Sequence, residues 1–205
     1  MLKKVLNKIS KLPPRTYIGI GLMLLSAVVA VWFYGRLYWQ RAFFTPKNAL
    51  VENQNKIIYA PINFDFSLII PKLNINAPVV ADVSGTEPNI YYTQLKKGAA
   101  HYKGTPTPDA NGNTVIFGHS SFIPSIHPGA YNTVFLMLDK LQKDDQIIVY
   151  YKSKPYYYKV QSINLVSDSD LSILQTTDHK QLTIMTCWPP GTDLKRLVII
   201  AAVQS

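Results

Sequence analysis

The stretch QLTIMTCWPPGTDLKRLVIIAA, residues 181–202, holds the only cysteine of the chain and an arginine nine positions after it. Residues 182–186 and 197–202 are short runs of apolar and β-branched residues, and the Pro-Pro-Gly and Asp between them favour a loop. We therefore predict a β-hairpin in which Cys187 and Arg196 lie near the ends of two adjacent strands. A cysteine in this position can act as a nucleophile, and an arginine facing it can hold a developing oxyanion.

Each of these two residues also has a plainer explanation. A lone cysteine is usually a small buried hydrophobic residue, and an arginine beside a strand is usually solvated or ion-paired at the rim. Because one cysteine cannot form a disulfide within the chain, the thiol is either buried, paired with another molecule, or used in chemistry. The choice between these depends on the rest of the chain.

Positive charge is concentrated at the N-terminal end. The formal net charge is +9, and residues 1–41 contain seven basic side chains and no acidic one. The other fourteen basic residues share residues 42–205 with all twelve acidic residues, which leaves a net charge of +2. The main body of the protein is therefore close to neutral, so we expect no nucleic-acid partner.

A membrane explains the basic end better. Residues 16–35 contain no charged side chain, and twenty helical residues span about 30 Å, the thickness of the hydrocarbon core. The excess of basic residues before this segment favours a cytoplasmic N-terminus. We predict a cytoplasmic tail over residues 1–15, a transmembrane signal anchor over 16–35 and a juxtamembrane stalk over 36–63. A cleaved signal peptide is the alternative, but its apolar region would be only about 7–15 residues long.

Residues 64–205 are predicted to form one mostly-β domain outside the cytoplasm, in a single-pass protein of the cell membrane. Short helices are expected at residues 89–95 and 133–141. Seven or eight short strands with few helices indicate a barrel or a sandwich. The strand-like runs are residues 66–75, 77–80, 114–117, 146–151, 156–165, 182–186 and 197–202. The predicted core consists of Phe66, Leu68, Ile70, Val79, Val115, Phe117, Leu138, Ile147, Val149, Val160, Ile163, Leu182, Ile184, Val198 and Ile200.

A histidine follows one of these strands. Residues 114–119 read TVIFGH, so an apolar run ends in Gly118 and His119. Glycine allows the backbone to turn sharply, so that the imidazole projects from the strand end. Histidine is the side chain best suited to exchange a proton with a thiol near neutral pH. A histidine at a strand end is more often hydrogen-bonded and inert, so this assignment depends on Cys187 lying nearby.

These motifs together resemble the sortases, the membrane-anchored cysteine transpeptidases of Gram-positive-type cell surfaces. Residues 183–187, TIMTC, are similar to the sortase signature TLxTC, with isoleucine where leucine is usual. Arg196 stands at the spacing of the sortase arginine, and Gly118-His119 matches the family's histidine segment. Residues 71–79 resemble its early IPKIxIxAP strands.

A further similarity lies in residues 134–149, which follow the family's FxxLxxLxxGDxI run except that Asp144 stands at the glycine. That difference leaves the geometry of this turn open. The resemblance extends over about residues 64–203.

The resemblance implies a closed β-barrel of about eight strands with short helices, and it assigns roles. Cys187 would attack the carbonyl of a peptide bond in an LPXTG-like sorting signal. His119 would protonate the leaving amine and deprotonate the incoming one, while Arg196 would hold the oxyanion or orient the substrate. Thr186 would help to line the site, and we expect Trp188 to shield the acyl-enzyme from water.

The implied partners are secreted surface proteins that carry a C-terminal LPXTG-like signal. The acceptor is an amine of a peptidoglycan precursor or cross-bridge, or of a pilin lysine, and the sequence does not choose between them or assign a sortase class. No cofactor or metal is expected, because one cysteine and scattered histidines lack the spacing of zinc ligands. Asp168 and Asp170 are candidate calcium ligands, but they are explained more simply as turn formers.

Two other functions share some of these features. A membrane-tethered β-domain that binds cell-wall or surface-protein peptides without turnover would share the fold, but we would expect it to lack His119, Cys187 or Arg196. The L,D-transpeptidases also use cysteine, histidine and arginine in the cell wall. Their cysteine and arginine are nearly adjacent, whereas nine positions separate them here.

Overall fold

The computed structural model describes residues 13–42, 50–53, 56–120 and 131–204. The chain divides into two compact units, Met1–Phe44 and Thr45–Ser205, and each is described by itself.

The first unit contains the helix α2 (Pro14–Ala42). Its segment Arg15–Trp32 has a mean hydropathy of 1.6 and is not buried within the protein, so it is long and apolar enough to cross a membrane. This is compatible with the predicted anchor. The helix continues to Ala42 and so includes the first seven residues of the predicted stalk. Most of the predicted cytoplasmic tail, residues 1–12, lies outside the described residues.

The second unit begins with an antiparallel hairpin of β1 (Leu50–Asn53) and β2 (Lys56–Tyr59), where no strand was predicted. The chain after the hairpin is tied to the domain by the side chain of Asn76. Its Oδ1 accepts a hydrogen bond from the Ile62 N–H at 2.9 Å, and its Nδ2 donates to the Ala60 carbonyl at 2.8 Å. The end of the predicted stalk is therefore attached to the domain.

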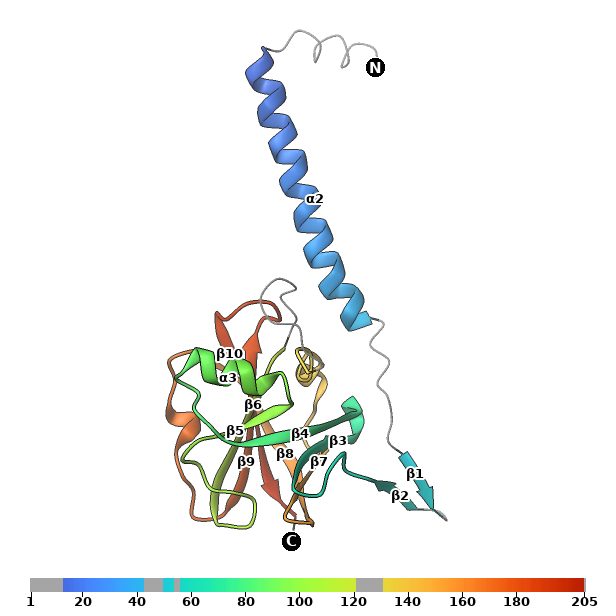
Figure 1. The fold of residues 1–205 in the computed structure, drawn as a ribbon, viewed down its shortest axis with the longest axis vertical. Helices are drawn as coiled ribbons and strands as arrows, with labels where there is room; N and C mark the ends of the chain where they lie inside the picture. Colours follow the sequence, from blue (N-terminus) through green and yellow to red (C-terminus); the bar gives the residue numbers. More distant parts are fainter. Residues whose placement is uncertain (1–12, 43–49, 54–55, 121–130, 205) are drawn as a thin grey trace. The chain divides into compact units, whose positions relative to one another are not determined.

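Eight strands form a closed barrel in the order β10-β8-β7-β3-β4-β5-β6-β9 (Figure 1). Two neighbouring pairs are parallel, β4 with β5 and β6 with β9, and the other pairs are antiparallel. The strands are β3 (Phe66–Ile70), β4 (Ile75–Val83), β5 (Ala99–Tyr102), β6 (Gly112–Gly118), β7 (Gln146–Tyr151), β8 (Lys154–Ser167), β9 (Lys180–Trp188) and β10 (Lys195–Val203). The prediction of a mostly-β closed barrel of about eight strands is confirmed.

The helical segments agree only in part with the sequence. The helix α3 (Pro88–Leu95) confirms the one expected at residues 89–95. The helix expected at 133–141 is wrong for most of its length, because only the 3₁₀ turn η2 (Leu138–Lys140) forms. The N–H of Phe135 bonds to the His119 carbonyl at 2.9 Å. That bond draws the segment toward β6 and away from helical i to i−4 pairing.

Two further 3₁₀ turns lie between strands of the barrel. The turn η1 (Pro71–Leu73) replaces the middle of the strand expected at residues 66–75, and Asn74 ends it in the left-handed region with φ 55°. The turn η3 (Ser172–Leu174) lies in the loop between β8 and β9.

The barrel interior is packed with alternate residues of its strands. On β10 the interior residues are Leu197, Ile199 and Ala201, so the predicted core residues Val198 and Ile200 lie on the other face. Val198 is nevertheless buried there, and Ile200 is half-buried. The sequence could not decide between the two faces because both rows of this strand are apolar.

Ile163 is the one predicted core residue that is exposed, at 36%. β7 pairs with β8 only as far as Lys159, so at Ile163 β8 has β10 beside it but no longer β7. Apart from the half-buried Ile200, the other predicted core residues are buried.

The turn before β7 resolves the question raised by Asp144. Asp144 adopts φ 70°, in the left-handed region that suits glycine best and that aspartate tolerates. Its N–H donates to the Val160 carbonyl at 2.8 Å. The neighbouring Asp145 accepts hydrogen bonds from the Gln142 N–H and from the Lys72 ammonium at 2.8 Å. The turn thus forms without glycine.

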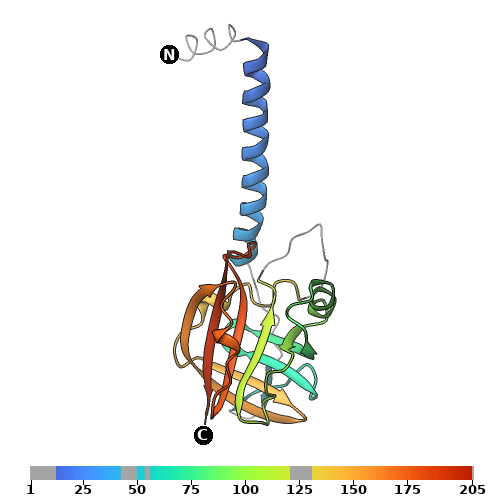
Figure 2. The same ribbon diagram turned by 90° about the vertical axis from the view of Figure 1, so that its left-hand side faces the viewer.

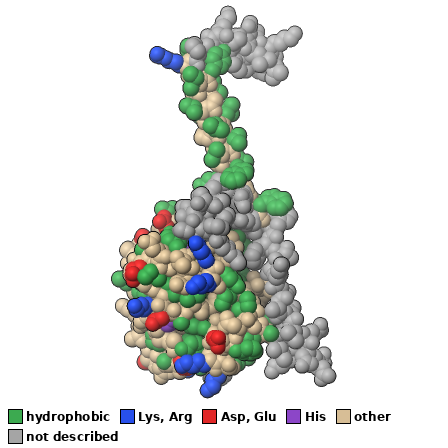
Figure 3. Space-filling view, viewed as in Figure 1, with side chains coloured by type: hydrophobic (Ala, Val, Ile, Leu, Met, Phe, Trp, Pro, Cys, Tyr) green, Lys and Arg blue, Asp and Glu red, His purple; other side chains and the backbone are tan. Residues whose placement is uncertain are grey.

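Charges of both signs are mixed on the surface of the second unit. On the face shown in Figure 3, Lys and Arg side chains are interspersed with Asp and Glu. Lys72 pairs with Asp145 at 2.8 Å, and Lys152 pairs with Asp109 at 3.1 Å. This mixture is expected of a body with a net charge of only +2.

Candidate active site

Cys187 and Arg196 are direct partners across the antiparallel strands β9 and β10. Side chains of such partners lie on the same face, with Cβ atoms about 5 Å apart. Leu182, Ile184 and Trp188 contact the interior cluster. Because side chains alternate along a strand, Cys187 points to the outer face of the barrel. The predicted hairpin, with the thiol and guanidinium on neighbouring strands, is confirmed.

His119 reaches the same face from the other side of β9. The strand β6 runs parallel to β9 (Figure 2). Gly118 lies beside Thr186, and His119 follows Gly118 directly. Neighbouring strands are about 5 Å apart. The Thr186 hydroxyl donates to the Gly118 carbonyl at 2.7 Å, and the Phe135 N–H donates to the His119 carbonyl at 2.9 Å. Backbone on both sides of His119 is therefore held in place.

Gly118 is needed here for space. Its φ does not lie in the left-handed region, so the sharp turn expected from the sequence is not the reason for a glycine at this position. A Cβ atom at this position would lie 2.8 Å from the ring of Phe135 and 3.0 Å from Cγ1 of Val134. Only glycine lets these side chains pack directly under the segment that carries His119.

The short helix α3 adds two aromatic residues that the sequence analysis missed. The ring of Tyr92 stacks on the imidazole of His119, with centroids 5.8 Å apart and an angle of 15° between the planes. The preceding Tyr91 packs edge-on against Phe117 with centroids 6.4 Å apart. No sequence motif connects this helix with the cysteine, so only the tertiary structure places it at the site.

The half-buried thiol of Cys187 is influenced by charges on both sides. Burial raises its pKa, the charge of Arg196 opposes that rise, and the carboxylate of Asp193 adds to it. An ordinary thiol is already largely protonated at neutral pH, and a raised pKa favours the neutral form of Cys187 further. Burial also raises the pKa of Tyr91 to about 12, so this phenol stays neutral. A thiolate at Cys187 would therefore require a nearby base to take up the proton.

The guanidinium of Arg196 is held by the loop between β9 and β10. Its Nη1 donates to the carbonyl of Asp193 at 3.0 Å and to that of Lys195 at 3.2 Å. These bonds limit the positions of the guanidinium beside its partner Cys187. Arg196 is thereby placed to act on charge that develops at the sulfur or at a bound carbonyl.

The two predicted substrate-contacting residues lie differently from Cys187. Thr186 is 3% exposed, and its hydroxyl bonds to β6 as described above. Trp188 is half-buried and packs against the interior cluster. Both alternate with Cys187 along β9, so their contact with a substrate stays a prediction.

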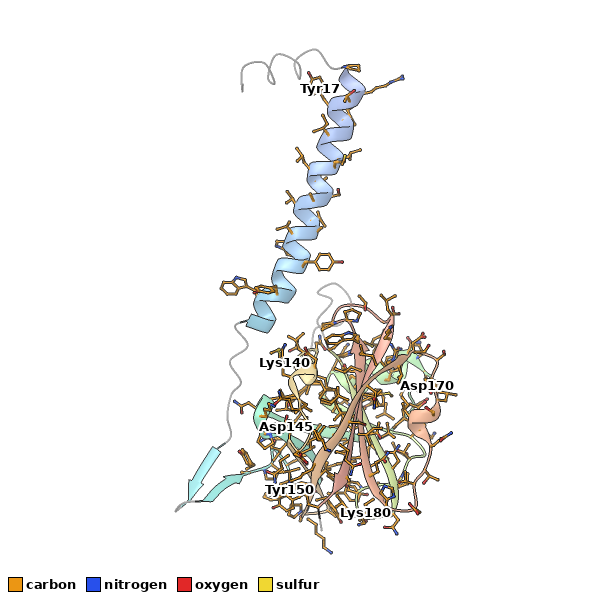
Figure 4. The ribbon with its side chains drawn as sticks, turned by 180° about the vertical axis from the view of Figure 1, so that it is seen from behind. Tyr17, Lys140, Asp145, Tyr150, Asp170 and Lys180 are labelled. Atoms are coloured by element: carbon orange, nitrogen blue, oxygen red, sulfur yellow. The ribbon has the colours of Figure 1, made fainter. Side chains whose placement is uncertain are left out.

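The candidate calcium ligands behave as turn residues. Asp170 accepts a hydrogen bond from the Ser172 N–H at 2.9 Å, at the start of η3, and Asp168 accepts one from the Ser167 hydroxyl at 3.3 Å. Figure 4 shows Asp170 beside this turn. Among the described residues, no three His, Cys, Asp or Glu side chains come together as a metal site would require.

Comparisons with known proteins agree on one family. The model of the sortase domain matches residues 68–204. Sortase D of Bacillus subtilis (strain 168) is 31% identical over 159 residues, which cover 75% of this chain and 71% of that protein. Sortase A from Corynebacterium diphtheriae superposes with a TM-score of 0.56 at 25% identity, over 70% of this chain and 61% of that one. The fold is also shared with a Clostridium perfringens sortase D5 transpeptidase, at 24% identity and a TM-score of 0.56, over 81% of this chain and 86% of that one.

Proposed function

This chain belongs to the sortase family, whose members are transpeptidases of the cell envelope, and on that premise we propose a specific reaction for it. It cleaves a C-terminal LPXTG-like sorting signal and joins the released protein to an amine. One observation carries the proposal. Arg196 on β10, Cys187 on β9 and His119 directly after β6 follow one another across three adjacent strands, at the same level of the barrel.

The first half of the reaction forms a thioester. His119 accepts the proton of the Cys187 thiol, and the sulfur attacks the carbonyl carbon of the peptide bond after the threonine of the signal. Arg196 stabilises the oxyanion of the tetrahedral intermediate. The carbon–nitrogen bond then breaks, and the leaving amine takes the proton from His119.

The second half reverses these roles. An incoming amine loses a proton to His119 and attacks the thioester carbonyl. The carbon–sulfur bond breaks, and Cys187 recovers its proton from His119. Because cleavage and joining are separate steps, an amine can compete with water for the same thioester.

The local environment suits a nucleophile that is released only during reaction. Burial keeps the pKa of Cys187 raised, so the proton must be removed as the carbon–sulfur bond forms. The stacking of Tyr92 on the imidazole restricts the ring of His119. A restricted base loses less orientational freedom when it takes up the proton.

The proposed setting is the membrane surface, with the N-terminus in the cytoplasm and the barrel outside. The apolar segment Arg15–Trp32 supports an anchor, and the basic residues before it support this orientation. Substrates that carry a sorting signal wait in the same membrane, so tethering raises the effective concentration of enzyme and signal. Protease treatment of intact cells tests the orientation, because digestion should remove the barrel and leave the N-terminal segment.

The reaction is tested with fluorogenic peptides that vary the LPXTG sequence, using the full chain in detergent. The unaltered protein should cleave at least one peptide after threonine, and Cys187→Ala should cleave none. Hydroxylamine should increase the rate of cleavage and give a peptide hydroxamate, because it captures the thioester. Short glycine peptides and lysine derivatives then distinguish the two kinds of amine acceptor by the mass of the product.

Two results would contradict the proposal. Cleavage that survives Cys187→Ala would show that the thiol is not the nucleophile. Binding of these peptides without cleavage of any of them would favour a non-catalytic peptide-binding domain.

A further inference from the structure

The helix α3 is fixed beside the active site by a second, smaller apolar cluster. The helix lies against β4 and β5 (Figure 1). Its buried Leu95 and half-buried Tyr91 are four positions apart, on one face of the helix. They belong to a cluster whose other members are Val80, Val83, Ala100, Tyr102, Phe117 and Met185. Met185 precedes Cys187 by two residues on β9 and so shares its face, which places the cluster next to the site.

Three aromatic rings lead from this cluster to the imidazole of His119. Tyr91 packs edge-on against Phe117, and its centroid lies 4.5 Å from that of Tyr92, with the planes at 45°. Burial, and after it a hydrogen bond with Tyr92, raises the pKa of Tyr91. Tyr92 in turn stacks on His119, with the planes only 15° apart. The ring of Tyr92 is therefore held with its face toward the imidazole.

The proposed reaction places a positive charge on His119 while the imidazole holds the proton of the thiol. The titratable and charged groups around this imidazole are the Cys187 thiol on β9, the Arg196 guanidinium on β10, the Asp193 carboxylate before β10 and the phenols of Tyr91 and Tyr92 on α3. The guanidinium lies two strand spacings away, about 10 Å, and its charge disfavours a second cation on the same face.

An aromatic ring can offset this repulsion. The face of such a ring carries negative charge and attracts a cation that lies within about 6 Å of its centroid. The centroids of Tyr92 and His119 are 5.8 Å apart, so the stacked ring lies within this range.

We propose that Tyr92 is a positioning residue that stabilises the protonated form of His119 through the face of its ring. This inference rests on the proposed function, and it adds a charge interaction to the restriction of the imidazole described there. The thiolate of Cys187 also attracts the imidazolium, but its charge passes to the oxyanion beside Arg196 when the carbon–sulfur bond forms. Tyr92 remains against the imidazolium until the leaving amine takes the proton.

The test measures by NMR the pH midpoint of the His119 imidazole signal, in the full chain in detergent with isotope-labelled histidine. The chain has four histidines, and the signal that is lost in His119→Gln belongs to His119. Tyr92→Leu removes the aromatic face, and Tyr92→Phe keeps it without the hydroxyl. Tyr102→Leu is the matched control, because Tyr102 belongs to the same cluster and packs against Phe117 with centroids 5.8 Å apart, but lies on β5.

Pentafluorophenylalanine in place of the phenylalanine of Tyr92→Phe provides a second test that leaves the packing nearly unchanged. Fluorine reverses the charge on the face of the ring, so a difference between the two rings arises from electrostatics rather than from shape. Steady-state kinetics on a cleaved peptide, with kcat separated from KM, follow the effect on the reaction.

We expect the proton affinity of His119 to fall about threefold in Tyr92→Leu, the size of a cation–π contact at a partly exposed site, and at least as far with the fluorinated ring. Tyr92→Phe and Tyr102→Leu should stay within about 1.5-fold of the parent, because both keep the face of an aromatic ring on the imidazole. In Tyr92→Leu, kcat should fall about threefold or more while KM stays within about twofold, and Tyr92→Phe should restore kcat.

An unchanged midpoint in Tyr92→Leu, or an equal shift in Tyr102→Leu, refutes the interaction of Tyr92 with the imidazolium. Tyr92→Phe that behaves like Tyr92→Leu, or a fluorinated ring that behaves like phenylalanine, excludes the face of the ring as the cause. A shifted midpoint with the kcat of the parent refutes the role in the reaction. If the parent cleaves no peptide, the proposed function fails, and the NMR midpoints still decide whether Tyr92 stabilises the protonated imidazole.

Discussion

The charges beside Cys187 lead to a pair of substitutions with opposite effects. Arg196 lowers the pKa of the thiol and Asp193 raises it. Arg196→Gln should therefore reduce the thiolate fraction at neutral pH, and Asp193→Asn should increase it. Lys195→Gln is the matched control, because it removes the same charge at an exposed neighbour whose side chain alternates with that of Arg196 along β10.

The size of the effect follows from the pairing of Cys187 with Arg196. Two unit charges about 7 Å apart at an effective dielectric constant of about 20 interact by roughly 2 kcal/mol. Arg196 is partly exposed, and solvent screening reduces this to about 1.4 kcal/mol, which is roughly a tenfold change in thiolate fraction. The carboxylate of Asp193 is exposed, so its effect should be about two- to threefold.

The assay is the rate of alkylation by iodoacetamide between pH 6 and 9, since the thiolate is the reacting form. At pH 7, Arg196→Gln should react about tenfold more slowly than the parent, Asp193→Asn two- to threefold faster, and Lys195→Gln within twofold. Circular dichroism confirms that each variant is folded. Equal slowing in Arg196→Gln and Lys195→Gln would refute the local pairing, and faster reaction of Arg196→Gln would reverse the assigned sign.

Three further predictions concern stability. Burial lowers the pKa of His101, so the unfolded chain binds more protons than the folded one as the pH falls below about 6.5, and the protein loses stability there. The melting temperature of His101→Gln should therefore change less between pH 7 and pH 5 than that of the parent. An equal change in both proteins would contradict this. Gly118→Ala should lower the free energy of unfolding by about 1–3 kcal/mol because a Cβ meets Phe135, and urea midpoints matching the parent would exclude that clash. Asp144→Gly should be at least as stable as the parent, whereas Asp144→Ala should be about 1 kcal/mol less stable. If the urea midpoints of the two variants fall in the reverse order, the φ of 70° at this position carries no strain.

Local patterns predicted much of the barrel correctly. β7 lies at residues 146–151 as expected, and most predicted core residues are buried. The short strand β5 was missed because its residues Ala99–Tyr102 have little β character and pair with β4 in parallel. A parallel partner comes from across a long connection, so no local turn marks it.

Sequence alone determined the apolar N-terminal segment, the hairpin that pairs Cys187 with Arg196, and the position of His119 directly after a strand. These are properties of short stretches, in which residue type and spacing carry the information. The tertiary structure decided which face of β10 points into the barrel. Both faces of this strand are apolar, so the alternation of side chains does not show which one is inside. It also brought Tyr92 to His119 and Asn113 to the β8–β9 loop. Such contacts join segments far apart in the chain, and they arise only when closure of the barrel brings those segments together.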